Sequence, residues 1–110
     1  MTINSRAKGA RGEREFADYL RKEGFEARRG QQFAGGKDSP DVVTNIPGVH
    51  FEVKRVEKGS IYPWIEQATR DAGNQIPVVA HRRNNERWIA ILPMMDLLEL
   101  LKKNGSSSDL

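Results

Sequence analysis

The sequence contains no cysteine and no long hydrophobic run. The absence of cysteine excludes disulfide bonds and thiolate metal sites. No apolar stretch approaches the roughly 18 residues that a membrane-spanning helix needs, so we expect no membrane partner. Residues 1–15 also lack the apolar segment of a secretory signal, and we therefore expect a cytoplasmic, intracellular protein.

The chain has 110 residues and a net charge of +3. This length predicts one small domain, residues 1–104, and the low-complexity segment 105–110 is expected to be a disordered tail. The basic residues form separate clusters: Arg6, Lys8, Arg11 and Arg14, then Arg28 and Arg29, then Arg82, Arg83 and Arg87. Clusters on separate elements favour a long polyanion as partner, although an ordinary solvated surface explains the charge equally well.

Hydrophobic periodicity and turn residues predict three helices and five strands. The expected helices cover residues 10–23, 63–72 and 94–103, and the expected strands cover residues 25–29, 41–45, 49–55, 76–83 and 87–93. Residues 30–39 show no period and contain three glycines, which predicts a loop. The order αβββαββα indicates an α/β domain with a mixed β-sheet flanked by helices.

Two helices carry an apolar stripe that we expect to face the core. The stripe of the first helix consists of Phe16, Ala17 and Leu20, and that of the last helix consists of Met94, Leu97, Leu98 and Leu101. Glu13 precedes the first stripe by three, four and seven positions, so it should face the sheet. Glu15 points elsewhere on the same helix and is expected to be solvated.

Charged residues stand inside the predicted hairpin of residues 41–55. If Pro47 and Gly48 form a two-residue loop, Asp41 lies opposite Lys54. Because side chains alternate between the faces of a strand, Asp41, Glu52 and Lys54 then share one face. Charges on a sheet are costly unless they are paired, bind a metal or take part in chemistry.

Carboxylate oxygens and a main-chain carbonyl are the ligands that Mg²⁺ prefers. Asp41 and Glu52, the main-chain carbonyl of Val53, and Glu13 acting through water form such a set. The bound ion would activate a water, and Lys54 would polarise that water or stabilise the phosphorane. Structural ion pairs are the alternative for any single residue, but the surplus of acids on one face favours a metal site.

Two segments resemble known nucleases. Pro40-Asp41 followed by Glu52-Val53-Lys54 matches the PD-(D/E)xK nuclease pattern, and Lys8–Arg29 resembles the opening of the archaeal-type Holliday junction resolvases. The resemblance extends to about Pro93 and includes relatives encoded by phages. It implies a restriction-endonuclease-like fold.

The resemblance also implies a function. It implies a homodimer that uses Mg²⁺, or Mn²⁺ in its place, to cut branched, four-way DNA, with Glu13, Asp41, Glu52 and Lys54 as catalytic residues. Arg29 matches a DNA-contacting arginine of the family. The full set of expected DNA contacts is Lys8, Arg11, Arg14, Arg28, Arg29, Lys37 and Arg55.

Three further residues have open interpretations. The family often places a serine in a shorter glycine-rich loop, where Ser39 is the substitute here. Gln67 corresponds to a glutamine used by some PD-(D/E)xK nucleases, with an exposed helix residue as the alternative. His50 shares the face of Glu52 by alternation, but we expect it on the surface or in support of a ligand.

Three rival functions remain open from the sequence. The first is a nuclease of the same fold that acts on flaps, ends or duplex sites. The second is a DNA-binding module without catalysis, which the intact set of acids and lysine argues against. The third is a structural or protein-binding domain, which predicts no salt-sensitive affinity for DNA.

Overall fold

The computed structural model describes residues 5–30 and 40–104, with the backbone alone for residues 5–8. The elements are α1 (Ser5–Lys22), β1 (Ala27–Arg29), β2 (Val42–Thr44), β3 (Val49–Lys54), α2 (Ile61–Ala72), β4 (Ile76–His81), β5 (Ile89–Ile91) and α3 (Met94–Asn104). This order confirms the predicted αβββαββα arrangement. All five strands are shorter than predicted and α1 begins five residues earlier than predicted, since the ends of elements are weakly defined by sequence pattern.

The strands form one mixed sheet in the order β1-β2-β3-β4-β5. β3 and β4 are parallel, and the other neighbouring strands are antiparallel. The parallel pair requires a crossover connection, which α2 supplies. The fold is therefore the expected α/β domain of the restriction-endonuclease-like type.

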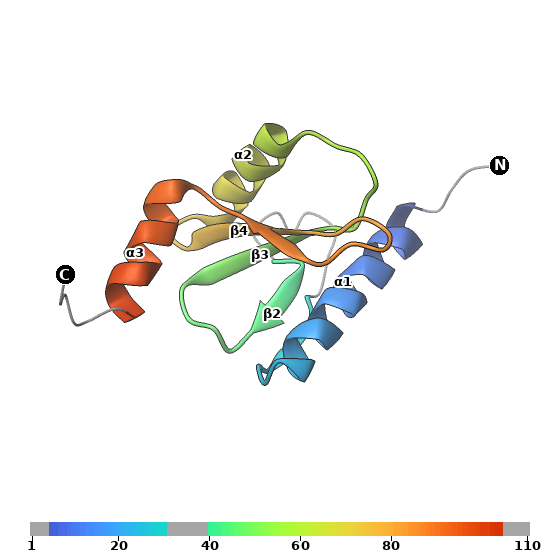
Figure 1. Ribbon diagram of the computed structural model, residues 1–110, viewed down its shortest axis with the longest axis horizontal. Coiled ribbons are helices and arrows are strands. Elements are labelled where there is room, and N and C mark those ends of the chain that lie inside the picture. Colours follow the sequence, from blue (N-terminus) through green and yellow to red (C-terminus); the bar gives the residue numbers. More distant parts are fainter. Residues whose placement is uncertain (1–4, 31–39, 105–110) are drawn as a thin grey trace.

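Helix α1 packs on one face of the sheet through its predicted apolar stripe. Phe16 and Ala17 are buried, and the ring of Phe16 lies 5.3 Å from that of Phe51 on β3. Val78 of β4 belongs to the same core cluster. Val79 points to the opposite face by alternation, and α2 packs along β4. Figure 1 shows α1 (blue) and α2 (yellow-green) on different sides of the sheet.

The predicted register of the β2–β3 hairpin is wrong by two residues. Val42 pairs with Phe51, which places Asp41 opposite Glu52 and not opposite Lys54. The connection is longer than two residues: Thr44 Oγ1 accepts a hydrogen bond from the Ile46 N–H (3.1 Å) inside it. A shift of two residues preserves the faces, because the side-chain period of a strand is two. The three charged residues therefore still share one face.

The prediction that the stripe of α3 faces the core is also wrong. Met94, Leu98 and Leu101 are exposed, and no residue of α3 is buried. Helical spacing identifies an apolar face but does not say which surface covers it. Figure 1 places α3 (red) away from α1. Among the described helices, none is long and apolar enough to cross a membrane.

Candidate active site

Asp41 is fixed at the point where β2 begins. Its N–H donates to the Phe51 carbonyl (2.9 Å), and its Oδ2 accepts the N–H of Val53 (2.8 Å). Its own carbonyl accepts the N–H of Gly30 (2.8 Å), at the end of β1. A Cβ atom at Gly30 would lie 2.1 Å from the Pro40 carbonyl oxygen, so this approach requires glycine. The backbone of Asp41 is thus held by β3 and by the end of β1, and its carboxylate is held by the Val53 N–H of β3.

Glu52 is a buried carboxyl in contact with two titratable neighbours. Oε1 lies 2.9 Å from Nε2 of His50, whose side chain is only 1% exposed. Burial raises the pKa of Glu52 to about 7; the His50 hydrogen bond opposes this shift, while the charge of Asp41 and a hydrogen bond with Asp41 add to it. Two acids therefore meet in a place where ionising both is costly.

Glu13 approaches the same pair from α1. Its side chain is 12% exposed and its Oε1 accepts a hydrogen bond from Nε of Arg29 (2.7 Å), a side chain that is 38% exposed. Burial raises the pKa of Glu13, Arg29 lowers it, and the charge of Asp41 raises it again. Glu13 therefore lies close enough to Asp41 for their charges to interact, and the guanidinium of Arg29 pairs with the Glu13 carboxylate.

Lys54 completes the predicted set. It lies two residues after Glu52 on β3, so the two side chains share a face, and it is half-buried. Its register partner on β4 is His81. Both strands end at this pair, so Lys54 lies at the C-terminal end of the central strand β3.

The donor chemistry of the site fits a hard divalent cation. Within residues 5–30 and 40–104, no group of three or more acidic, histidine or cysteine side chains gathers closely enough to hold a metal by itself. Two carboxyls, Asp41 and Glu52, do meet; burial raises the pKa of Glu52, and the charge of Asp41 and its hydrogen bond with Glu52 add to this shift. Mg²⁺ keeps several of its waters and commonly uses one or two carboxylates, so this pair is an adequate donor set.

The predicted DNA contacts differ in their surroundings. Arg11, Arg14 and Arg28 are exposed. Arg55 is 19% exposed, and its Nε donates to Glu15 (3.1 Å). Lys37, Ser39 and the side chain of Lys8 lie outside the described residues. Gln67 is exposed on α2, in agreement with the simpler of its two interpretations.

Sequence reasoning missed the partners of Glu15 and the burial of His50. Glu15 is not simply solvated, because Arg55 and Arg82 both donate to its carboxylate. Its partners follow two different strands, and no spacing along the chain indicates that. The expectation of His50 at the surface is wrong, because its side chain is 1% exposed and contacts Glu52; alternation gave only the face that the two residues share.

Comparison with known families gives one finding. Residues 4–99 match the family described as archaeal Holliday junction resolvase (hjc). No curated protein matches the chain. The match covers α1 through most of α3 and includes all four residues of the candidate active site.

Proposed function

Because the chain belongs to the archaeal Holliday junction resolvase family, we propose that it is a magnesium-dependent, structure-selective endonuclease that resolves four-way DNA junctions. One observation carries this proposal: Asp41 and Glu52 meet on the face of the sheet that also carries Lys54, and Glu13 of α1 lies close enough to Asp41 for their charges to interact. Simple ion pairing does not require such a surplus of acids. Metal-assisted hydrolysis of a phosphodiester does, because the acids hold the cation that stabilises charge on the scissile phosphate.

Four groups are proposed to hold the metal. Asp41 and Glu52 bind it directly, and Glu13 acts through a water because Arg29 already engages its carboxylate. The N–H of Val53 points to Asp41. The carbonyl of a strand residue points to the same side as its N–H, which supports the Val53 carbonyl as a further ligand. When bound, Mg²⁺ or Mn²⁺ supplies charge neutralisation and a more acidic water.

Lys54 is proposed to act on the reacting groups. Its ammonium orients the attacking water and stabilises the negative charge that develops on the phosphate oxygens. The water oxygen forms the new bond to phosphorus and its proton leaves to solvent or a nearby carboxylate; the bond to the leaving oxygen breaks, and that oxygen keeps the electron pair and takes a proton from solvent. Lys54 lies two residues after Glu52 on β3, so the two side chains share a face and are proposed to act on the same phosphate.

The surrounding arginines are proposed to bind the DNA backbone. Arg11, Arg14 and Arg28 are exposed, and Arg29 is partly exposed beside Glu13. Lys8 and Lys37 are proposed on their charge alone. Arg55 is a less suitable phosphate contact, because Glu15 and Glu57 already pair with it. Arg11 and Arg14 lie on α1 and Arg28 and Arg29 on β1, and backbone contacts from separate elements suit recognition of branch shape more than of base edges.

A homodimer is part of the proposal. One chain carries one site, whereas resolving a junction requires two symmetric cuts. A closed two-fold dimer provides two identical sites in a fixed relation. Sedimentation at micromolar concentration, with and without junction DNA, tests this directly.

The decisive experiment offers a labelled four-way junction beside a flap and a plain duplex, with and without Mg²⁺. We expect Mg²⁺-dependent, paired cuts in the junction alone. Glu52→Gln should bind the junction as tightly as the native protein and fail to cut it. Equal cleavage by that variant would refute the catalytic assignment. Preferential cleavage of flaps or duplex would instead indicate a nuclease of the same fold with another substrate, and binding without any cleavage a DNA-binding module.

A further inference from the structure

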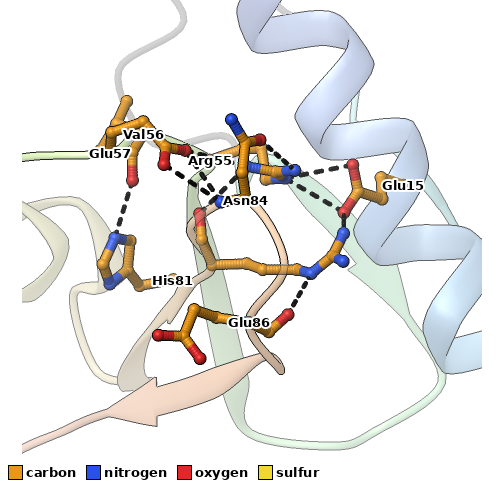
Figure 2. A network of polar contacts seen from close by, with 8 residues as sticks. Glu15, Arg55, Val56, Glu57, His81, Asn84 and Glu86 are labelled. Carbon is orange, nitrogen blue, oxygen red and sulfur yellow. Dashed lines mark hydrogen bonds and ion pairs between the residues drawn. The ribbon is translucent and has the colours of Figure 1, made fainter.

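Glu15 is held by two arginines from different strands. Nε of Arg55 donates to both of its carboxylate oxygens (3.1 and 3.2 Å), and Nη1 of Arg82 donates to Oε1. Figure 2 shows Glu15 reaching from α1 toward these groups. Arg55 is largely buried and Glu15 and Arg82 are partly so, which makes this cluster less screened than a surface ion pair.

The two arginines stand at equivalent places in the sheet. Arg55 follows the last residue of β3 and Arg82 follows the last residue of β4. The strands are parallel and end together at Lys54 and His81, and the Arg82 N–H continues the ladder to the Lys54 carbonyl (3.2 Å). Glu15 therefore connects α1 to the C-terminal ends of β3 and β4, where Lys54 also lies.

Arg55 is oriented by other groups besides Glu15. Its Nη2 donates to Oδ1 of Asn84 (3.0 Å) and its Nη1 to the carbonyl of Arg82 (3.4 Å). Glu57 accepts the N–H of Asn84 (2.9 Å), which closes the network seen in Figure 2. Groups other than Glu15 thus also hold the Arg55 guanidinium in place, which favours a role as an anchor for Glu15.

The opposite side of α1 is fixed by Glu13. Residues two apart on a helix point roughly 200° away from each other, so Glu13 and Glu15 leave α1 on different sides. Glu13 pairs with Arg29 of β1, and Glu15 pairs with the ends of β3 and β4. Between them Gly12 lies so close to β3 that a Cβ atom there would be 2.6 Å from Cβ of Arg55. Rotating or sliding α1 would break one of these contacts and move Glu13 relative to Asp41.

We propose that Glu15, anchored by Arg55 and Arg82, is a positioning residue that sets the rotation of α1 and thereby holds Glu13 beside the Asp41–Glu52 pair. The inference rests on the proposed nuclease function. It gives Arg55 and Arg82 a role within the protein and not on the DNA. Glu15 itself touches neither metal nor substrate.

The test compares Glu15→Gln with Asp18→Asn in the full chain. Asp18 is on the same helix and loses the same charge, but its ion pairs with Arg21 and Lys22 stay within α1. We expect Glu15→Gln to lower kcat on a four-way junction at least ten-fold, with KM for the junction unchanged. Asp18→Asn should leave both parameters as in the native protein. Equal kcat values for the two variants, or a fall in kcat accounted for by the unfolded fraction at the assay temperature, overturn the proposal.

A second readout does not depend on cleavage. Binding of Mn²⁺ alone, followed by electron paramagnetic resonance, should weaken several-fold in Glu15→Gln and stay unchanged in Asp18→Asn. In a Glu13→Gln background, adding Glu15→Gln should produce no further weakening, because Glu15 acts through Glu13. Independent, multiplying effects of the two substitutions overturn the proposal. If the native protein neither binds Mn²⁺ nor cuts the junction, the proposed function fails instead, and the two failures are distinguishable.

Discussion

At the scale of single residues, folding raises the pKa of two carboxyl groups at this site above the value for a carboxyl in water. Glu52 is buried against another acid, and its pKa rises to about 7 for that reason. Glu13 is buried too, but an arginine partly restores its tendency to ionise. Each of these two carboxyls interacts with Asp41, and acids with a perturbed pKa that cluster in this way are typical of functional sites.

Glu52 should make the metal-free protein less stable as the pH rises. Its folded pKa, about 7, exceeds the ordinary value of 4.5. The folded state therefore binds more protons between these values, and the contribution of Glu52 to stability, full below 4.5, is lost as the pH rises through 7. Glu52→Gln should match the native protein near about pH 4 and be the more stable of the two near about pH 8. Denaturant unfolding across this range measures the difference, and parallel curves would contradict it.

Arg29 should control the pH at which Glu13 ionises. The guanidinium lowers the pKa of Glu13 against the effect of burial, so Arg29→Met should raise that pKa further. The acidic limb of the pH profile of kcat should then move to higher pH. Arg28→Met removes the same charge from the adjacent, exposed position and should leave the limb in place. An equal shift of the acidic limb in both variants would contradict the prediction and show that any lost surface charge has the same effect.

At the scale of elements, α1 and β3 approach each other more closely than ordinary side chains allow. Gly12 faces Arg55 and Val53, and its missing side chain is what permits the contact. The same helix carries Glu13 and Glu15. The distance between α1 and the sheet therefore sets the position of Glu13 at the candidate metal site and the length of the ion pairs of Glu15 with Arg55 and Arg82.

Two glycine-to-alanine substitutions in α1 should have opposite effects on stability. Gly9 is exposed and a Cβ atom added there would have no neighbour within 4 Å, so Gly9→Ala should stabilise the helix by about 1 kcal/mol. Gly12→Ala should destabilise the protein by roughly 1–3 kcal/mol, because the new Cβ atom forces α1 away from β3. Thermal or denaturant unfolding measures both, and a stabilising Gly12→Ala would contradict the close approach.

At the scale of the whole molecule, the three exposed arginines proposed to contact DNA, Arg11, Arg14 and Arg28, lie on α1 and β1, and α3 lies away from α1. These two elements also carry Glu13 and Arg29, so we expect a basic DNA-binding side next to the candidate active site. Association with a polyanion releases counterions in proportion to the phosphates that such a side neutralises.

The salt dependence of junction binding should identify this side. Replacing Arg11, Arg14 and Arg28 with alanine together should reduce the slope of log affinity against log salt by roughly two to three. Lys102 and Lys103 at the end of α3 provide the matched control, and their replacement should leave the slope unchanged. Fluorescence anisotropy at several salt concentrations measures both, and equal losses would contradict a localised binding side.

The sequence by itself determined the element order and the faces of the site. Period-two alternation was enough to put Asp41, Glu52 and Lys54 on one face, and an error of two residues in the register left that conclusion intact. Helical spacing likewise placed Phe16, Ala17 and Leu20 in the core. These features depend on residues within a few positions of each other, except for the face of Asp41, which also depends on the hairpin that pairs β2 with β3.

Tertiary structure alone decided which groups meet across elements. The pairing of Glu15 with Arg55 and Arg82, the neutralisation of Glu13 by Arg29, and the exposure of the α3 stripe depend on how separate elements pack. Long side chains reach several neighbours from one backbone position, so spacing along the chain does not select a partner. The raised pKa of Glu52 has the same origin, since burial and a nearby charge exist only after the chain has folded.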